Sequence, residues 1–281
     1  MPTLNCQISQ SLQTVLEQRS KDSGESIDHL VTSTLSRCLG VPLHTLFQVS
    51  TSAALVQGIY ERAVSSSDLL NYGDLGLGTF DNLDGEMVVL DGSIYQVRGN
   101  GTVARVVDDT GTPFAVVVRF VADQDQTIES VTSLEYLTRA CDRYRDSNNL
   151  FYAFRIDGRF KHIHTRAMKP TLNGIPLAQA ATTQPEFNFK DIEGTLVGIW
   201  APLFSKTFNI VGYHFHFLSE DRTKGGHLLE CSGTNLRVRV ERLNDFHLAL
   251  PESEEFLRAD LTKDTSKDLA FAEQTRQKEK A

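Results

Sequence analysis

The sequence predicts an α+β fold, in which several strands form sheets and a few helices lie beside them. Runs rich in β-branched and aromatic residues recur along the chain and are separated by Asp-Gly pairs, which favour tight turns. Other segments carry apolar residues at helical spacing, most clearly residues 27–39. With 40% hydrophobic and 23% charged residues, the 281-residue chain has the composition of a folded protein and not of a disordered one.

Residues 1–40 form a predicted module of their own, a strand followed by two helices. Apolar and polar residues alternate over residues 3–8, and apolar residues recur at helical spacing over residues 9–19 and 27–39. This order resembles a ribbon-helix-helix module, in which two chains pair their strands. The outward strand residues that would read DNA are Thr3, Asn5 and Gln7.

The charge of this module disfavours DNA binding. Its three basic residues stand against four acidic ones, a balance that cannot neutralise many phosphates. We therefore expect dimerisation to be its role. The alternative is a plain helical hairpin packed on the main domain, residues 41–281.

The main domain begins with a predicted strand at residues 46–50, a short helix at residues 52–60 and a second helix capped by Ser67. Residues 73–80 contain three glycines, but no helix follows to offer the positive dipole end that a phosphate loop uses. We expect strand bends and close backbone packing there. Residues 82–97 predict a β-meander, whose first Asp-Gly turn places Glu86 at the start of a strand.

The rest of the chain is predicted to be mainly β-structure. Residues 130–145 predict a helix, and residues 151–166 predict a hairpin that turns at Asp157-Gly158. The charged residues 251–281 predict a frayed helix or disorder. Four further segments predict strands: residues 112–121, 184–189, 194–200 and 236–250.

Two histidines one residue apart, His214 and His216, lie in a run rich in β-formers. Side chains at i and i+2 of a strand leave the same face, so both imidazoles should point one way. A turn with two glycines follows, and His227 returns on the predicted partner strand. Three protein nitrogens with a vacant fourth position are typical of a catalytic metal centre. The alternative is an exposed hairpin, but the interleaved aromatic residues suggest one face in apolar core and the other in a closed polar cleft.

A second His-x-His motif, His162 and His164, shares a predicted strand face with Arg166. It has no third histidine nearby, and the charge of Arg166 would repel a cation. We expect a solvated or substrate-facing strand here.

Charge and cysteine usage exclude several classes of protein. A net charge of -8 disfavours a nucleic-acid partner, and the four cysteines lack the Cys-x-x-Cys spacing of a zinc knuckle or the density of a disulfide framework. The N-terminus has no signal-peptide pattern, and no stretch approaches a membrane span. The prediction is a soluble cytoplasmic protein.

Several motifs together carry a resemblance to the α-acetolactate decarboxylase family, in the family's order over roughly residues 44–275. They include the turn before Glu86, the strand at Arg166 and the histidine hairpin. The first forty residues lie outside the resemblance. The matching segments are residues 73–80, 83–86, 112–114, 155–158, 183–187, 193–195, 212–217 and 225–227.

The resemblance implies an α+β fold with two β-sheet regions of mixed and antiparallel strands, a few flanking helices, and a homodimer or higher homo-oligomer. It implies a zinc ion held by three histidines and a catalytic set of an arginine and two glutamates. The implied metal ligands are His214, His216 and His227, and the implied catalytic residues are Arg166, Glu86 and Glu273.

The implied reaction is the decarboxylation of 2-acetolactate to acetoin and carbon dioxide through a zinc-stabilised enediolate. The substrate's own ketone can accept the electrons that carbon dioxide leaves behind, so no pyridoxal or thiamine cofactor is needed, and no motif for one is visible. Zinc would chelate the ketone and hydroxyl oxygens, while Arg166 would hold the carboxylate with a two-pronged contact. Glu86 or Glu273 would manage the protons, and the sequence leaves open which does which.

Two alternatives compete with this interpretation. A cupin-like mononuclear metal oxygenase would use Glu220 as a ligand beside His214 and His216, whereas the decarboxylase needs His227 and leaves Glu220 in an exposed turn. The second alternative is a non-enzymatic ligand sensor in which residues 1–40 bind DNA. The excess of acidic over basic residues in residues 1–40 disfavours it.

Overall fold

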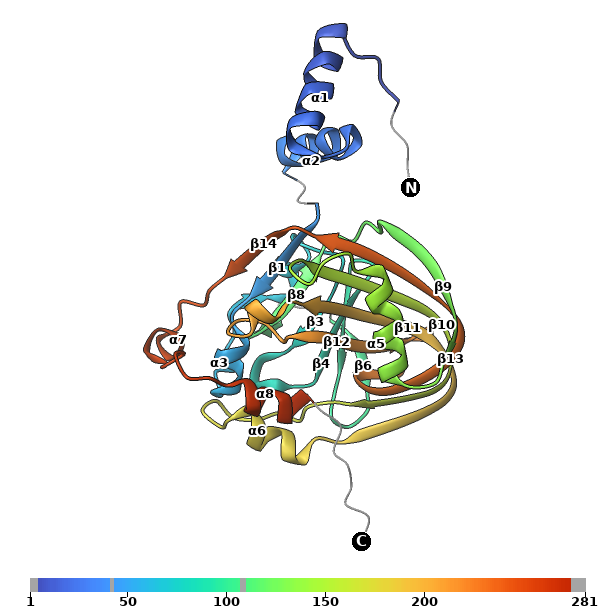
Figure 1. Cartoon of the computed structure of the whole chain (residues 1–281). Helices are drawn as coiled ribbons and strands as arrows, with labels where there is room; N and C mark the ends of the chain where they lie inside the picture. The colour runs from blue at the N-terminus through green and yellow to red at the C-terminus, as the bar shows by residue number, and fades with distance from the viewer. Residues whose placement is uncertain (1–4, 41–42, 107–109, 274–281) are drawn as a thin grey trace. The chain divides into compact units, whose positions relative to one another are not determined.

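The computed structural model describes residues 5–40, 43–106 and 110–273. The chain divides into two compact units, Met1–Leu43 (unit 1) and His44–Ala281 (unit 2) (Figure 1). The fold is α+β with antiparallel and mixed strands, which confirms the predicted class. Within the described ranges, no helix is both long and apolar enough to cross a bilayer.

Unit 1 contains two helices, α1 (Gln10–Ser23) and α2 (Ile27–Leu39). Ser9 caps α1 by accepting a hydrogen bond from the Leu12 amide, and Gly24 ends it in the left-handed conformation that glycine adopts without strain. Both helices were predicted. The predicted strand is absent from residues 5–9, and its first residues, 1–4, lie outside the described part. A single chain offers such a strand no neighbour for its backbone groups.

Unit 2 carries all the strands among the described residues, together with six short helices and four 3-10 turns. The strands are β1 (Thr45–Val49), β2 (Val64–Ser65), β3 (Leu75–Thr79), β4 (Glu86–Leu90), β5 (Ser93–Val97), β6 (Val103–Arg105), β7 (Gly111–Thr112), β8 (Ala115–Val118), β9 (Gln124–Val131), β10 (Phe151–Arg166), β11 (Glu186–Ala201), β12 (Gly212–Ser219), β13 (Gly225–Leu243) and β14 (Asp245–Ala249). The helices are α3 (Ser52–Val56), α4 (Ser66–Leu69), α5 (Leu134–Cys141), α6 (Leu177–Ala180), α7 (Glu254–Arg258) and α8 (Ser266–Glu273), and the 3-10 turns are η1 (Asp81–Leu83), η2 (Asp142–Tyr144), η3 (Ala181–Thr183) and η4 (Leu203–Ser205).

Two large sheets form unit 2. Seven strands lie in the order β14-β1-β8-β3-β4-β5-β6, antiparallel except for the parallel pair of β1 and β14. The second sheet has the order β10-β11-β12-β13-β9, and β10 also pairs with β13, so four of its long strands close into a ring. These curved strands sweep round one side of unit 2 in Figure 1. β2 and β7 form a separate two-stranded ribbon.

The two sheets pack face to face, because alternate side chains of a strand leave opposite faces. One buried cluster joins residues of both sheets, among them Val88 of β4 and Val197 of β11. The next residue along β4, Val89, belongs to a different cluster on the outer face of the seven-stranded sheet. On the outer face of the five-stranded sheet, α5 covers a third cluster rich in aromatic side chains.

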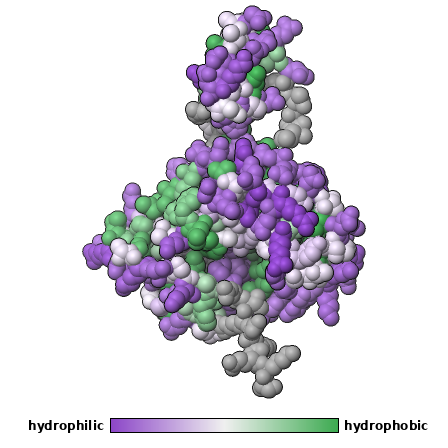
Figure 2. Space-filling view, in the orientation of Figure 1, coloured by the Kyte–Doolittle hydropathy of each residue, from purple (hydrophilic) through white to green (hydrophobic). Residues whose placement is uncertain are grey.

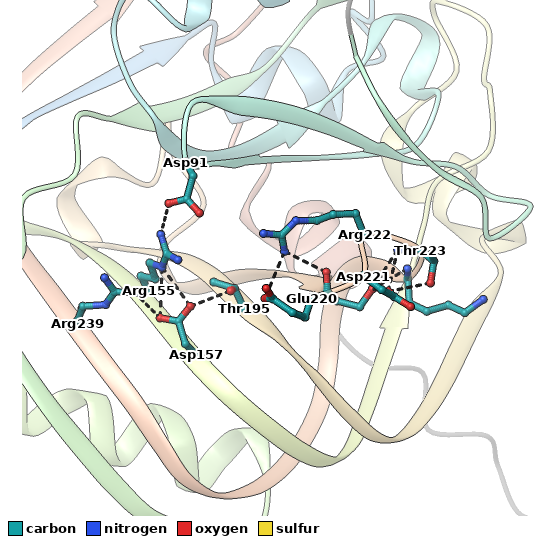
Figure 3. A network of polar contacts seen from close by, with 11 residues as sticks. Asp91, Arg155, Asp157, Thr195, Glu220, Asp221, Arg222, Thr223 and Arg239 are labelled. Carbon is teal, nitrogen blue, oxygen red and sulfur yellow. Dashed lines mark hydrogen bonds and ion pairs between the residues drawn. The ribbon is translucent and has the colours of Figure 1, made fainter.

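The predicted hairpin at Asp157-Gly158 is wrong, since β10 runs unbroken from Phe151 to Arg166. The Asp157 carboxylate is held by the side chains of Arg155, Thr195 and Arg239, which come from β10 and its two neighbours (Figure 3). The register against β13 shifts just after Asp157. The Asp-Gly pair therefore marks an irregularity within a long strand and not a turn.

Three smaller expectations have different outcomes. The helix predicted over residues 130–145 begins only at Leu134, because β9 extends to Val131 and Ser133 provides the cap. The cap of α4 is Ser65 and not Ser67. The expectation of close packing at residues 73–80 holds. A Cβ atom added to Gly76 or Gly78 would collide with the backbone carbonyl oxygens of Val116 and Phe114, respectively.

Candidate metal centre

The hairpin of β12 and β13 brings three histidines to one point between the sheets. His214 and His216 leave β12 on the opposite face from Phe215, which packs in the outer aromatic cluster. His227 lies directly opposite His216 across the strand pair. The three side chains are 8%, 1% and 5% exposed, and their ring centres are 4.9 to 5.4 Å apart.

These histidines fit a metal ion. Each offers a ring nitrogen, the three nitrogens lie within 4.8 Å of one another, and the described part of the chain holds no other such group of three. His216 Nδ1 lies 2.8 Å from the Met87 carbonyl oxygen, which can only accept, so Nδ1 is the donor and Nε2 carries a lone pair. That Nε2 is buried and has no hydrogen-bond partner among the described residues. Such a lone pair, facing two further imidazoles, is suited to a cation.

Burial keeps the three rings neutral, which is the form that binds a metal. Loss of hydration lowers the pKa of His214 to about 3. Burial and nearby positive charge hold the pKa values of His216 and His227 well below the ordinary range.

The predicted arginine and both glutamates lie beside the histidines. Arg166, at the end of β10, is 3% exposed, and its Nη2 lies 3.4 Å from Glu273 Oε2 on α8. Glu273 Oε2 also lies 3.7 Å from His214 Nε2 and 3.5 Å from His227 Nε2. Glu86, at the start of β4, has Oε2 at 3.6 Å from His216 Nε2. The structure thus brings together all six residues that the sequence singled out.

Burial dominates the charge state of the two carboxyl groups. It raises the pKa of Glu86 to about 7, although Arg166 opposes the shift and the Met168 amide donates to Glu86 Oε1 at 3.1 Å. Burial also raises the pKa of Glu273, again against the attraction of Arg166.

Gln184 is a site residue that the sequence did not single out. Its Oε1 accepts a hydrogen bond of 2.7 Å from Arg166 Nη1, whose other neighbour is the weakly accepting sulfur of Met168 at 3.7 Å. Arg166 Nε is buried and has no hydrogen-bond partner in the described ranges. One edge of the guanidinium is therefore held by protein, while Nε remains available to a ligand. The only signal for Gln184 was its place in a segment that resembles the family.

Two adjoining cavities open at this centre. The smaller, of about 40 Å³, is lined by the three histidines, Arg166 and both glutamates together with apolar side chains such as Leu83 and Met168. The larger, of about 380 Å³, shares Ile210, His227 and Glu273 with it and is otherwise mainly apolar.

The second His-x-His motif and Glu220, which the alternative interpretations would use, do not belong to the histidine centre. His162 Nε2 is 2.9 Å from Asn188 Oδ1, and His164 Nε2 is 3.0 Å from a carboxylate oxygen of Glu186. Glu220 is exposed in the turn after β12, and its nearest ion-pair partner is Arg222 at 3.9 Å. Glu220, the ligand that the predicted cupin-like oxygenase would use, is therefore not part of the histidine centre.

The model of one protein family, described as "Alpha-acetolactate decarboxylase", matches residues 46–263. This chain belongs to that family. The decarboxylase of Methanosarcina mazei is 38% identical over 262 residues, covering 92% of this chain and 88% of its own. That of Bacillus subtilis strain 168 is 35% identical over 237 residues, covering 83% and 92%.

Solved structures of the family share the fold. The crystal structure of α-acetolactate decarboxylase from Bacillus subtilis strain 168 matches with a TM-score of 0.80 at 34% identity, covering 82% of this chain and all of that one. A Staphylococcus aureus protein described as similar to α-acetolactate decarboxylase matches with a TM-score of 0.78 at 29% identity, covering 81% and 99%.

Proposed function

We propose that this protein decarboxylates 2-acetolactate to acetoin and carbon dioxide at the buried histidine centre, with zinc as its metal. The observation that carries the proposal is the convergence of three imidazoles, one guanidinium and two carboxyl groups on a single small cavity. Membership of the decarboxylase family supports the substrate. His214, His216 and His227 would hold the zinc ion, whose Lewis acidity stabilises negative charge on the ketone and hydroxyl oxygens of the substrate.

Arg166 binds and orients the substrate carboxylate in this proposal. Its Nε, which has no hydrogen-bond partner among the described residues, and its Nη2, which lies 3.4 Å from Glu273 Oε2, form the edge of a planar fork that matches the two carboxylate oxygens, while Gln184 holds Nη1. Fixing the carboxylate fixes the direction of the bond that breaks. The bond between C1 and C2 cleaves, carbon dioxide leaves, and the electron pair moves onto the ketone to give an enediolate.

Glu86 and Glu273 are the two groups within reach that can hold or move a proton. The enediolate needs one proton at C2 to become acetoin, and the substrate hydroxyl needs a partner for its own proton. The two carboxyl groups approach different histidines, Glu86 at His216 and Glu273 at His214 and His227. Delivery of the C2 proton by one fixed group would give a single acetoin enantiomer.

The decisive experiment incubates the purified protein with racemic 2-acetolactate and follows carbon dioxide and acetoin before and after treatment with a chelator. We expect turnover that the chelator abolishes and added zinc restores. His227→Ala should lose bound metal and activity, while the matched change His162→Ala in the second His-x-His motif should keep both. Absence of acetoin from metal-loaded protein would refute the proposal, and metal retained by His227→Ala but lost by Glu220→Ala would favour the oxygenase.

We also propose that unit 1 pairs with a second copy of itself. No residue of α1 is buried, and large apolar side chains on both helices are exposed, among them Val15 and Leu35. A two-helix unit of this size cannot bury enough surface to be stable alone, and an identical unit offers the same apolar faces with little charge repulsion. Light scattering should show a smaller assembly for Val15→Glu and Leu35→Glu than for the surface control Thr14→Glu. An unchanged mass would exclude this dimer.

The four cysteines are all free. Because unpaired thiols persist in a reducing compartment, we propose that the protein is located in the cytoplasm. Fractionation of cells would test this location.

A further inference from the structure

The apolar cavity beside the metal centre is larger than the proposed substrate needs. Carboxylate, hydroxyl and ketone belong with the histidines, Arg166 and the glutamates, and the small cavity has apolar wall residues of its own, such as Leu83 and Met168, for the two methyl groups of 2-acetolactate. The adjoining cavity of about 380 Å³ lies within the size range of sites that take a whole organic ligand. Figure 2 shows hydrophobic residues gathered round a hollow on this face of unit 2.

The wall of this cavity has a clear chemical character. Its apolar side chains come from four separate parts of unit 2: α5, η4 with the segment after it, the hairpin of β12 and β13, and α8. They include Leu134, Ile210, Val211, Phe215, Leu228 and Leu269.

Among the described residues, the wall of this cavity offers no unpaired charge for a second ionic group. Lys206 at its wall lies 3.8 Å from Asp264, and Glu273 lies 3.4 Å from Arg166. The imidazole in its wall is that of His227. Its occupant should therefore be an uncharged hydrocarbon group, and the shared residues His227 and Glu273 place that group next to the reacting atoms.

We propose that this cavity binds an alkyl or aryl substituent of larger 2-hydroxy-3-oxo acids, so that the protein also converts substrates with longer acyl chains than 2-acetolactate. The inference rests on the proposed decarboxylation and uses the same step. The bond between C1 and C2 breaks, carbon dioxide leaves, the electron pair moves onto the ketone, and C2 takes a proton. The product is a longer α-hydroxy ketone.

The first test is a series of 2-hydroxy-2-methyl-3-oxo acids whose acyl chain grows from two to eight carbons. Each buried methylene should lower KM by about fourfold until the cavity is filled, since burial of one methylene is worth about 0.8 kcal/mol. If the cavity is only a solvent entrance, KM will stay level or rise with chain length, and this result would overturn the inference.

Variants that fill the cavity from two sides sharpen the test. Val211 and Ala270 both line it and are not buried, so phenylalanine can replace either without disturbing the core. Val211→Phe and Ala270→Phe should lower kcat/KM for the eight-carbon acyl substrate at least tenfold and leave 2-acetolactate within about twofold. The control Leu257→Phe, on α7 and outside the cavity wall, should change neither. Equal losses on short and long substrates would contradict the assignment.

A binding measurement separates this inference from the proposed decarboxylation. 2-Hydroxy-2-methylalkanoic acids lack the ketone and cannot react, so calorimetry can follow their dissociation constants in the full-length protein. We expect Kd to fall with chain length, with an increasingly negative heat-capacity change, and to do so less in Val211→Phe. A falling Kd without turnover of any substrate would keep the cavity assignment and reject the decarboxylase. Turnover of 2-acetolactate together with a Kd that does not change with chain length would support the decarboxylase and reject the cavity assignment.

Discussion

The amide of Gln184 determines which edge of the Arg166 guanidinium is free to bind a carboxylate. Gln184 Oε1 accepts from Nη1 at 2.7 Å, and in Gln184→Leu the remaining neighbour of Nη1 is the Met168 sulfur at 3.7 Å. Glu273, already 3.4 Å from Nη2, would then compete for the whole guanidinium. We expect Arg166 to turn toward Glu273 and away from the substrate.

The size of the effect follows from the lost bond. A hydrogen bond that involves a charged group contributes about 2 kcal/mol, which corresponds to a loss of about 30-fold in kcat/KM. Most of it should appear in KM, because the carboxylate is bound before the chemical step. Gln184→Glu should raise KM further, since its negative charge pairs with Arg166 and repels the substrate. The control is Gln179→Leu, the same change at an exposed position of α6.

Steady-state acetoin formation together with a double-mutant cycle tests this reasoning. If Gln184 acts through Arg166, its replacement should cost far less in an Arg166→Lys background than in the wild type. Equal losses in both backgrounds would show that Gln184 acts by another route. A lowered melting temperature with an unchanged KM would show a purely structural role.

Three further predictions concern single residues. Arg166→Lys should lose at least 100-fold in kcat/KM while retaining its metal by elemental analysis, because a point charge does not reproduce the planar fork; near-normal activity would remove Arg166 from this role. Glu86→Gln and Glu273→Gln should each lose about 100-fold or more in kcat, and chiral chromatography should show racemic acetoin for the one that protonates C2. Asp157→Asn should lower the free energy of unfolding by about 2 kcal/mol at pH 7, measured by denaturant titration. Burial alone would raise the pKa of Asp157, but Arg239, Arg155 and Thr195 outweigh it and hold the pKa below its usual range. The stabilisation is therefore present above the unfolded-state pKa of about 4 and disappears as the pH falls through the folded-state value, so the variant should approach the wild type in acid.

The local parts of the site could be predicted from sequence because short-range geometry determines them. Alternation along a strand puts His214 and His216 on one side, and the glycine-containing turn returns His227 to the same place. Glu86 follows a tight turn and so begins a strand. Gln184 offered no such pattern, because its role depends on a contact between η3 and the end of β10 that only the folded chain creates.

The same dipeptide had opposite outcomes at two places for a physical reason. Asp91-Gly92 connects the antiparallel strands β4 and β5, as the turn propensity predicts. Asp157-Gly158 has the same propensity but lies among side chains that bind its carboxylate, and β10 continues through it with partners on both sides. Pairing along a 16-residue strand outweighs a preference worth a fraction of a kilocalorie per residue.

Most of the proposed catalytic residues lie on strands, whereas much of the apolar cavity wall lies on peripheral helices and loops. This division explains how the catalytic groups can stay in place while the substrate specificity changes. The three histidines, Arg166 and Glu86 all project from strands of the two packed sheets, where neighbouring backbones fix their positions. Much of the wall of the apolar cavity instead comes from α5, α8 and the segment after η4, at the edge of the sheets. Changes in that wall can alter the substituent that fits without moving the metal ligands. Glu273 is the exception, since α8 supplies both this carboxyl group and part of the cavity wall, so a substituent that displaces α8 would affect binding and proton transfer together.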